Sequence, residues 1–405
     1  MTQTIDSRRY DIDWLRTLAF GLLILYHIGM YYVAEWGWHI KSPQQFAWLQ
    51  DLMLLTNPWR MSLLFFISGI ALALVADRYG AGRLVALRSS RLLIPLLFGM
   101  FVIVSPQPYF EALDQDLIQP GFLAFWLDYI NPFTSLLRDH HSPIGLLTWN
   151  HLWFLPYLWI YSLLLIALLP LLNRLAANRQ LAQLRGRWAL LMVMGLLLAA
   201  WLTLRYVFPS THALLDDWYN HAKYLPVFMA GYLFARQGSW WQQVIRYRMG
   251  FLAAAVTAYL LIIIEHHGLV PGLDALYARS FSARAAYGAL YSINHWAWIL
   301  ALVGLAGHWL NRPSGVLRYT DKAILPWYML HQTLIIVFAA NLSTWQLPTA
   351  LEAALILLLT CAGCYLGYEL VRRIAWLRWL FGLKADARRV TPARLATPPA
   401  VAIQK

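Results

Sequence analysis

The chain has 405 residues, of which 60% are hydrophobic and 13% are charged, and its mean hydropathy is +0.51. These values exclude an ordinary soluble domain and indicate a polytopic membrane protein. The formal net charge of +13 would suit a nucleic-acid-binding protein, but the basic residues lie at segment ends and in short loops without a basic aromatic patch, which excludes nucleic acid as a partner.

Apolar segments of about 17 to 25 residues recur along the chain, the length of helix that crosses the roughly 30 Å hydrocarbon layer of a bilayer. Nothing in the pattern indicates barrel strands, so we expect an all-α transmembrane domain over residues 1–383 and a disordered cytoplasmic tail over 384–405. The segment 110–150 is too polar to span. Ten spanning helices are predicted at residues 13–34, 58–76, 91–108, 151–172, 188–208, 222–237, 249–265, 287–310, 322–341 and 350–372.

Basic residues occupy every second connection between these segments, and lysine and arginine in short loops are retained on the cytoplasmic side. The pattern predicts a multi-pass membrane protein with an even number of spans and both termini in the cytoplasm. The absence of an internal repeat argues against a transporter built from inverted halves. The basic residues of this pattern are Arg8, Arg9, Arg78, Arg83, Arg88, Arg174, Arg179, Arg185, Arg187, Arg236, Arg246, Arg248, Arg312, Arg318, Arg372, Arg373, Arg378 and Lys384.

The first predicted helix, 13–34, carries three ionisable residues, Asp13, Arg16 and His27. Such groups within a spanning helix are costly and usually face a partner or a cavity. Arg16 and His27 are eleven residues apart, which places them on nearly the same helix face and roughly 16 Å apart along the axis. One interpretation is a buried Asp13–Arg16 pair with a hydrogen-bonded histidine; the shared face favours a functional role instead.

The second predicted helix, 58–76, begins after Asn57, a suitable N-cap, and carries Arg60 in its first turn. Ser68 and Gly69 follow within it. We expect them to permit tight packing near a cavity, because no nucleophile-elbow pattern surrounds the serine.

Three more histidines fall in predicted helices. His151 lies at the outer start of 151–172 and His295 about two turns into 287–310, both on the outer side with His27. His331 lies roughly at midmembrane in 322–341. Because no His-x-x-x-His spacing occurs, we expect no metal or haem site. The paired loop histidines, which we expect to be solvated, are His140, His141, His266 and His267.

Cys361 and Cys364 form a C-x-x-C pattern inside the last predicted helix. No redox domain surrounds them. Gly363 and Gly367 form G-x-x-x-G in the same segment, which favours small-residue helix packing as the reason for this composition.

Several segments together resemble a known family. Arg16 and His27 in "RTLAFGLLILYH" match the arginine, ten residues, histidine signature of the membrane-bound acyltransferase family 3. The opening through "WGWHIKSP" and "NPWRMSLLFFISGIAL" resembles the branch that includes the glucan biosynthesis protein C succinyltransferases. The resemblance continues in "RSSRLLIPLLFGM", "NHLWFLPYLW", "YSINHWAWILALVG" and "ILPWYMLH", so it covers nearly the whole chain.

The resemblance implies O-acyl transfer from cytoplasmic acyl-CoA, acetyl-CoA or succinyl-CoA, to a hydroxyl of a periplasmic or membrane-associated glycan. It implies that His27 is the catalytic residue. A neutral imidazole can remove the proton of a sugar hydroxyl during attack on a thioester, and the ordinary histidine pKa of about 6.5 suits this role. An acyl-histidine intermediate uses the same residue and stays open. The acid partner of His27 also stays open: Asp13 is too far along the helix, and Glu35 is one candidate.

The phosphates of CoA need arginine forks or helix N-termini. Arg16, Arg88 and Arg91 lie on the same predicted cytoplasmic side and are the candidate donor contacts; the alternative is that they anchor the topology. Arg60 is expected either to face an acyl carboxylate or the reaction centre, or to snorkel to the interface. The expected site is thus catalytic His27 and Arg16, donor contacts Arg88 and Arg91, and cavity residues Asp13, Glu35, Arg60, Ser68, His151, His295 and His331.

Two other functions are compatible with the residues alone. Buried ionisable groups also line the pathway of a transporter or exporter of a glycan or lipid, and a noncatalytic component of a polysaccharide-assembly complex would share the same helices. The expected partners are acyl-CoA, a glycan acceptor and the lipid bilayer; the pattern leaves the oligomeric state open.

Overall fold

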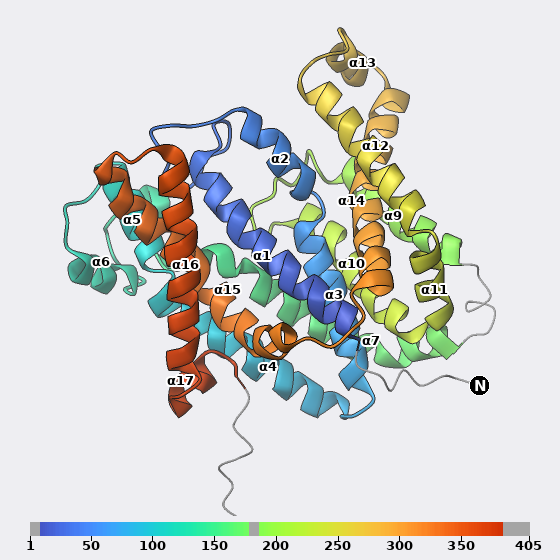
Figure 1. The fold of residues 1–405 in the computed structure, drawn as a ribbon, viewed down its shortest axis with the longest axis horizontal. Coiled ribbons are helices and arrows are strands. Elements are labelled where there is room, and N and C mark those ends of the chain that lie inside the picture. The colour runs from blue at the N-terminus through green and yellow to red at the C-terminus, as the bar shows by residue number, and fades with distance from the viewer. Residues whose placement is uncertain (1–8, 178–185, 384–405) are drawn as a thin grey trace, which may run out of the picture.

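The computed structural model describes residues 9–177 and 186–383, which form a bundle of helices (Figure 1). Within these ranges there is no β-strand, as the hydropathy pattern predicted. The tail 384–405 lies outside the described residues, as do Arg8, Arg179, Arg185 and Lys384 of the charge pattern.

Each of the ten predicted segments overlaps one long helix of the described chain. These helices are α1 (Tyr10–Tyr32), α3 (Arg60–Ala76), α4 (Ala81–Phe98), α7 (Phe154–Ala177), α9 (Gly186–Thr203), α10 (Trp218–Arg236), α12 (Arg248–His266), α14 (Phe281–Trp309), α15 (Gly315–Leu342) and α16 (Thr349–Val371). The predicted segment 91–108 is placed too late, because α4 begins ten residues before it and the segment's second half lies in η1 (Gly99–Ile103) and α5 (Pro106–Asp114).

Shorter elements connect or extend the long helices. These are α2 (Trp48–Thr56), η1 (Gly99–Ile103), α5 (Pro106–Asp114), α6 (Phe122–Tyr129), η2 (Arg138–His140), η3 (Asn150–Trp153), α11 (Gly238–Arg246), α13 (Leu273–Arg279), η4 (Ser343–Trp345) and α17 (Ala375–Leu380). The polar segment 110–150, predicted not to span, contains α6 and η2 together with the end of α5.

Eight helical stretches of the described chain are long and apolar enough to cross a membrane. They confirm the all-α polytopic prediction. The other two long helices do not meet this criterion: the apolar part of α9 covers only Leu190–Thr203, and the first turns of α10 contain the polar residues Asn220, His221 and Lys223.

Helix α1 crosses the middle of the bundle and packs against α3, α14 and α15 (Figure 1). The helix pairs with the most extensive contacts are α3 with α10, α12 with α14, and α15 with α16. Two large apolar clusters form most of the core, and α3 contributes to both, because the fully buried Phe65 belongs to one and the fully buried Phe66 to the other. This central position brings residues of α1, α3, α10 and α15 to one place.

The chain after α1 folds back against that helix. Lys41 donates hydrogen bonds to the carbonyl oxygens of Met30 (2.7 Å), Trp36 (3.0 Å) and Val33. Carbonyls at a helix C-terminus lack partners in the helix and carry partial negative charge, so a lysine there stabilises the turn. As a result, the chain between α1 and α2 is tied to the end of α1.

Helix α16 approaches α15 through small residues. A Cβ atom built at Gly363 would lie 2.9 Å from Leu334 Cδ1, and one at Gly367 would lie 2.6 Å from Leu330 Cδ1. Both cysteines of this helix, Cys361 and Cys364, are free thiols. The packing interpretation of the C-x-x-C segment therefore agrees with the structure.

The contact between α3 and α10 requires glycine on both sides. A Cβ atom at Gly69 would lie 2.0 Å from the carbonyl oxygen of Phe228, and one at Gly231 would lie 2.1 Å from that of Phe66. Because these neighbours are backbone atoms, they cannot rotate away. The two helices can lie this close only without side chains at these positions.

We predict that Gly231→Ala separates α3 from α10 and lowers the thermal unfolding midpoint of the purified protein, because overpacking of this kind costs about 1–3 kcal/mol or more. The matched control is Gly195→Ala in α9, where no atom lies within 4 Å of the added Cβ. Equal midpoints for the two variants would contradict the close contact.

Candidate active site

His27 is hydrogen-bonded to a second histidine from another helix. Its Nδ1 atom lies 2.9 Å from Nε2 of His331 in α15, and the two ring centres are 5.0 Å apart in a stacked arrangement. The Nδ1 atom of His331 lies 2.8 Å from the carbonyl oxygen of Tyr328, one turn earlier in α15. The three groups form a continuous chain from α1 to the backbone of α15.

The direction of this chain follows from its last member. A carbonyl oxygen only accepts hydrogen bonds, so neutral His331 carries its proton on Nδ1 and donates it to Tyr328. His331 Nε2 is then an acceptor, and His27 donates to it from Nδ1. Nε2 of His27 keeps its lone pair, and this atom can accept a proton from a substrate.

A cavity of about 610 Å³ opens beside His27. Trp38 lies over the histidine, with nearly parallel rings whose centres are 6.5 Å apart. The remaining lining residues come from α1, α2, the α2–α3 connection, α3, η3, α10, α14, α15 and the loop that follows α9. They are Leu23, Tyr26, Met30, Leu54, Asn57, Pro58, Arg60, Met61, His151, Trp153, Arg205, Ser210, His212, Tyr219, Lys223, Tyr224, Tyr291, His295 and Tyr328.

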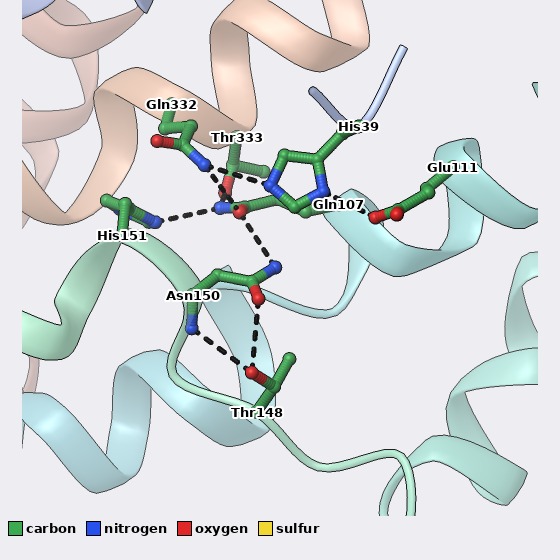
Figure 2. A network of polar contacts seen from close by, with 8 residues as sticks. All are labelled: His39, Gln107, Glu111, Thr148, Asn150, His151, Gln332 and Thr333. Atoms are coloured by element: carbon green, nitrogen blue, oxygen red, sulfur yellow. Dashed lines mark hydrogen bonds and ion pairs between the residues drawn. The ribbon is translucent and has the colours of Figure 1, made fainter. Parts of the chain in front are cut away.

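A polar network holds the α15 segment that follows His331 (Figure 2). Gln107 donates to Thr333 (2.7 Å) and to His151 Nδ1 (3.0 Å), and its carbonyl oxygen accepts from Gln332 (3.1 Å) and from Asn150 (3.1 Å). Because every hydrogen-bonding group of this buried amide has a partner, the network is rigid and fixes one arrangement of α5, η3 and α15.

The network continues to the loop after α1. Gln332 Nε2 lies 3.2 Å from His39 Nε2, and His39 Nδ1 lies 2.5 Å from Glu111 Oε2 (Figure 2). His151 donates from Nε2 to the carbonyl oxygen of Met329 at 3.1 Å. His151 is thus a structural partner of the α15 backbone as well as a cavity residue.

Arg16 lies in a charged cluster near the beginning of α1. It donates to Asp321 of α15 and lies 3.4 Å from Asp13, while its Nε atom is buried without a hydrogen-bond partner among the described residues. The charge of Arg91 interacts with those of Asp321 and Arg16, and the charge of Arg88 with that of Arg91. Arg91 of α4 is therefore near Arg16 and Asp321, and Arg88 precedes Arg91 by about one turn of α4.

An apolar groove lies between this cluster and the level of His27. It has a volume of about 670 Å³, is formed by α1, α15 and α16, and begins at Thr17 and Thr320, whose hydroxyl oxygens are 3.0 Å apart. It reaches Leu25 and Trp327. These residues cover most of the roughly 16 Å that separate Arg16 from His27 along α1.

The other predicted cavity residues lie in different places. Arg60 is only 6% exposed and lines the cavity, so it does not snorkel. His295 also lines the cavity, and its Nε2 atom is buried without a partner in the described chain. Glu35 is exposed in the loop after α1, and Ser68 is not among the described lining residues. The partner on Nδ1 of His27 is a histidine rather than an acid.

Sequence reasoning missed three charged residues of the site: Asp321, Lys223 and Arg205. Asp321 precedes the predicted helix 322–341 by one residue, Lys223 lies inside the predicted helix 222–237, and Arg205 lies inside the predicted helix 188–208. The signal was an ionisable residue in or beside a spanning segment, the same signal that identified Arg16 and His27.

The histidines do not form a metal centre in the part of the chain that the structure describes. No group of three or more His, Cys, Asp or Glu side chains there is arranged to hold a metal ion. His27 and His331 are hydrogen-bonded to each other, and His151 and His331 each bond to a carbonyl oxygen of α15.

Comparison with known proteins gives a consistent result. A family model described as an acyltransferase domain, that of the acyltransferase 3 family, matches residues 9–369. Two curated relatives, the glucans biosynthesis protein C of Escherichia coli O139:H28 (strain E24377A) and that of Escherichia coli K12 (strain DH10B), are each 24% identical to the chain over 400 residues, which cover 95% of it and 96% of the relative. No solved structure gives a significant match.

The family match covers both Arg16 and His27 and nearly all of the described helices. The distant relatives are similar along their whole length. The chain therefore belongs to the acyltransferase 3 family and is a multi-pass membrane acyltransferase.

Proposed function

We propose that the protein transfers an acetyl or succinyl group from cytoplasmic acyl-CoA to a hydroxyl of a periplasmic or membrane-associated glycan, with His27 as general base. The observation that carries this proposal is the chain from His27 Nδ1 through His331 to the Tyr328 carbonyl, which leaves Nε2 of His27 as a proton acceptor beside a cavity. Acyltransferase family membership favours an enzyme over a transporter or a noncatalytic component.

In the proposed reaction, His27 Nε2 removes the proton of the glycan hydroxyl as its oxygen attacks the thioester carbonyl carbon. The carbon–sulfur bond breaks, and the CoA thiolate takes up the proton and leaves as the free thiol. A hydroxyl is a poor nucleophile at neutral pH, so a positioned base contributes typically 10²–10⁴-fold to such a step. His331 accepts the Nδ1 hydrogen bond throughout and stabilises the imidazolium that forms.

The donor is proposed to bind at the Arg16 end. Arg16, Arg88 and Arg91 provide the positive charge that the CoA phosphates require. The apolar groove between α1, α15 and α16 suits the pantetheine arm, which must extend toward His27. With the donor entering at the Arg16 end, we propose that both termini of the chain are in the cytoplasm, on the inner face of a bacterial inner membrane.

The acceptor is proposed to bind in the cavity beside His27. Trp38, Trp153, Tyr26 and Tyr224 supply aromatic faces, and Asn57 and Ser210 lie among the polar lining groups. The printed name of the relatives refers to glucan biosynthesis, which supports a glucan or a related glycan as acceptor.

We expect His27→Ala to fold and insert normally but to lose at least about 10²-fold in acyl transfer, because the base is removed. The measurement is CoA thiol release together with mass spectrometry of a glucan oligosaccharide acceptor. The control is His140→Ala, which changes an exposed loop histidine. Full activity in His27→Ala would contradict the mechanism.

The same assay, run without acceptor, separates general-base catalysis from an acyl-histidine. General-base catalysis predicts no acyl adduct on the peptide that contains His27 after rapid denaturation. A stoichiometric adduct at His27 would instead establish nucleophilic catalysis at the same residue.

His331 is proposed as a positioning residue. His331→Leu removes the acceptor that orients His27, so we expect kcat to fall roughly 10²–10⁴-fold while KM for acyl-CoA stays unchanged. His331→Gln offers a carbonyl oxygen to His27 Nδ1 and should recover part of kcat. A Leu variant with normal kcat, or a Gln variant no better than Leu, would show that the hydrogen bond does not orient the base.

Arg16 is proposed to contact a CoA phosphate. Arg16→Lys keeps the charge but loses the planar fork, so KM for acyl-CoA should rise about tenfold or more. The same substitution should be nearly silent with an acyl-pantetheine donor, which lacks the nucleotide phosphates. Equal effects with the two donors would indicate a structural role for Arg16 in the Asp13 and Asp321 cluster.

A further inference from the structure

The cavity beside His27 carries an excess of positive charge. Arg60 at the start of α3, Lys223 in the first turns of α10 and Arg205 after α9 all line it. The lining residues in the described ranges include no aspartate and no glutamate. Lys223 interacts electrostatically with both arginines, so three cations share one cavity.

Arg60 is buried with unused hydrogen-bond donors. Its Nε and Nη1 atoms have no hydrogen-bond partner in the described chain. Its Cζ atom lies 3.3 Å from the centre of the Tyr26 ring, and Tyr26 precedes His27 in α1. Arg60 is close enough to His27 for its charge to act on that imidazole. A buried guanidinium with unpaired N–H groups is unfavourable unless an anion or other acceptors approach it.

Lys223 also has no ion-pair partner among the described residues. Its Nζ atom lies 4.4 Å from the centre of the Tyr224 ring. The buried carboxylate of Asp217 interacts with it electrostatically, but the oxygens of Asp217 accept hydrogen bonds from Tyr157, from Asn220 and from two backbone N–H groups. This carboxylate therefore holds the loop before α10 and does not bind Lys223 directly.

His212, in that loop, adds no further charge. Burial, together with the nearby Lys223, lowers the pKa of His212 to about 4. At pH 7 this histidine is neutral and offers a hydrogen-bonding group to the cavity. The positive charge is thus concentrated on the two arginines and the lysine.

We propose that Arg60 and Lys223, with Arg205 beside them, bind an anionic group, a carboxylate or a phosphate, on the substrate that reacts at His27. This inference rests on the proposed acyl transfer. The anion is carried either by the acyl group of the donor or by the acceptor glycan, since both can present the same chemistry to the cavity. The nucleotide phosphates of CoA are not the source, because they are assigned to the Arg16 end.

The first test measures binding without catalysis. Thermal unfolding of the purified protein is followed with succinate and its neutral analogue succinamide, and with glycerol 3-phosphate and glycerol, at constant ionic strength. We expect at least one anion, and neither neutral compound, to raise the midpoint. In Arg60→Gln and Lys223→Gln the anion should bind about tenfold to hundredfold more weakly, the effect of losing one or two charge-assisted hydrogen bonds.

The matched control is Arg279→Gln, which removes the same charge from an exposed position in α13 outside the cavity lining. Because Arg60→Gln risks misfolding at a buried site, Lys223→Gln provides an independent variant. An unchanged midpoint with both anions in the wild-type protein, or equal anion binding in both variants and the control, would overturn the proposal.

The second test identifies the source of the anion. If the acyl group carries it, Arg60→Gln should reduce turnover of succinyl-CoA at least about tenfold more than turnover of acetyl-CoA. If the acceptor carries it, the loss should be the same with both donors and should appear only with an anionic acceptor. The proposal would be overturned if Arg60→Gln reduced turnover with acetyl-CoA and a neutral glucan as much as it reduced turnover with the charged substrates.

The two proposals fail in different ways. A protein that binds anions at Arg60 and Lys223 but consumes no acyl-CoA would contradict the proposed function. A protein that transfers acyl groups without regard to the charge of donor or acceptor would contradict only the anion site.

Discussion

The hydrogen bond between His27 and His331 is the contact on which the rest of the site depends. It joins α1 to α15 at His331, which is fully buried, so this ring must find its hydrogen-bond partners inside the protein. The Tyr328 carbonyl fixes His331, His331 fixes His27, and the amide network around Gln107 fixes the α15 segment that follows His331. The orientation of Nε2 of His27 is thereby set by four helical segments, α1, α5, η3 and α15.

This arrangement explains why a single helix carries both Arg16 and His27. Helix α1 is continuous between them, so it holds a charged cluster and a proton-accepting nitrogen at a fixed separation of roughly 16 Å. The apolar groove follows the same helix along most of that length. A donor with a charged nucleotide and a long flexible arm fits this geometry, because charge is needed at one end and an apolar path between the ends.

The sequence predicted the helices well because a spanning segment must satisfy its own backbone and therefore follows hydropathy and length. Arg16 and His27 could be found because they lie on one helix, where spacing alone determines the shared face. His331 could be recognised only as a buried histidine, since its pairing with His27 joins residues 304 positions apart. The Arg16–Asp321 contact and the cation cluster around Arg60 and Lys223 depend on how α1, α3, α10 and α15 are packed, which hydropathy does not specify.

The most direct test of the central claim is the protonation state of the two histidines, observed by ¹⁵N NMR of the protein labelled at histidine and assigned with His27→Gln and His331→Gln. At neutral pH we expect both rings to be neutral and to carry their proton on Nδ1, with a hydrogen bond from His27 Nδ1 to His331 Nε2. A signal that places the proton of His27 on Nε2 would contradict this claim, because the atom facing the substrate would then be a donor and not a base.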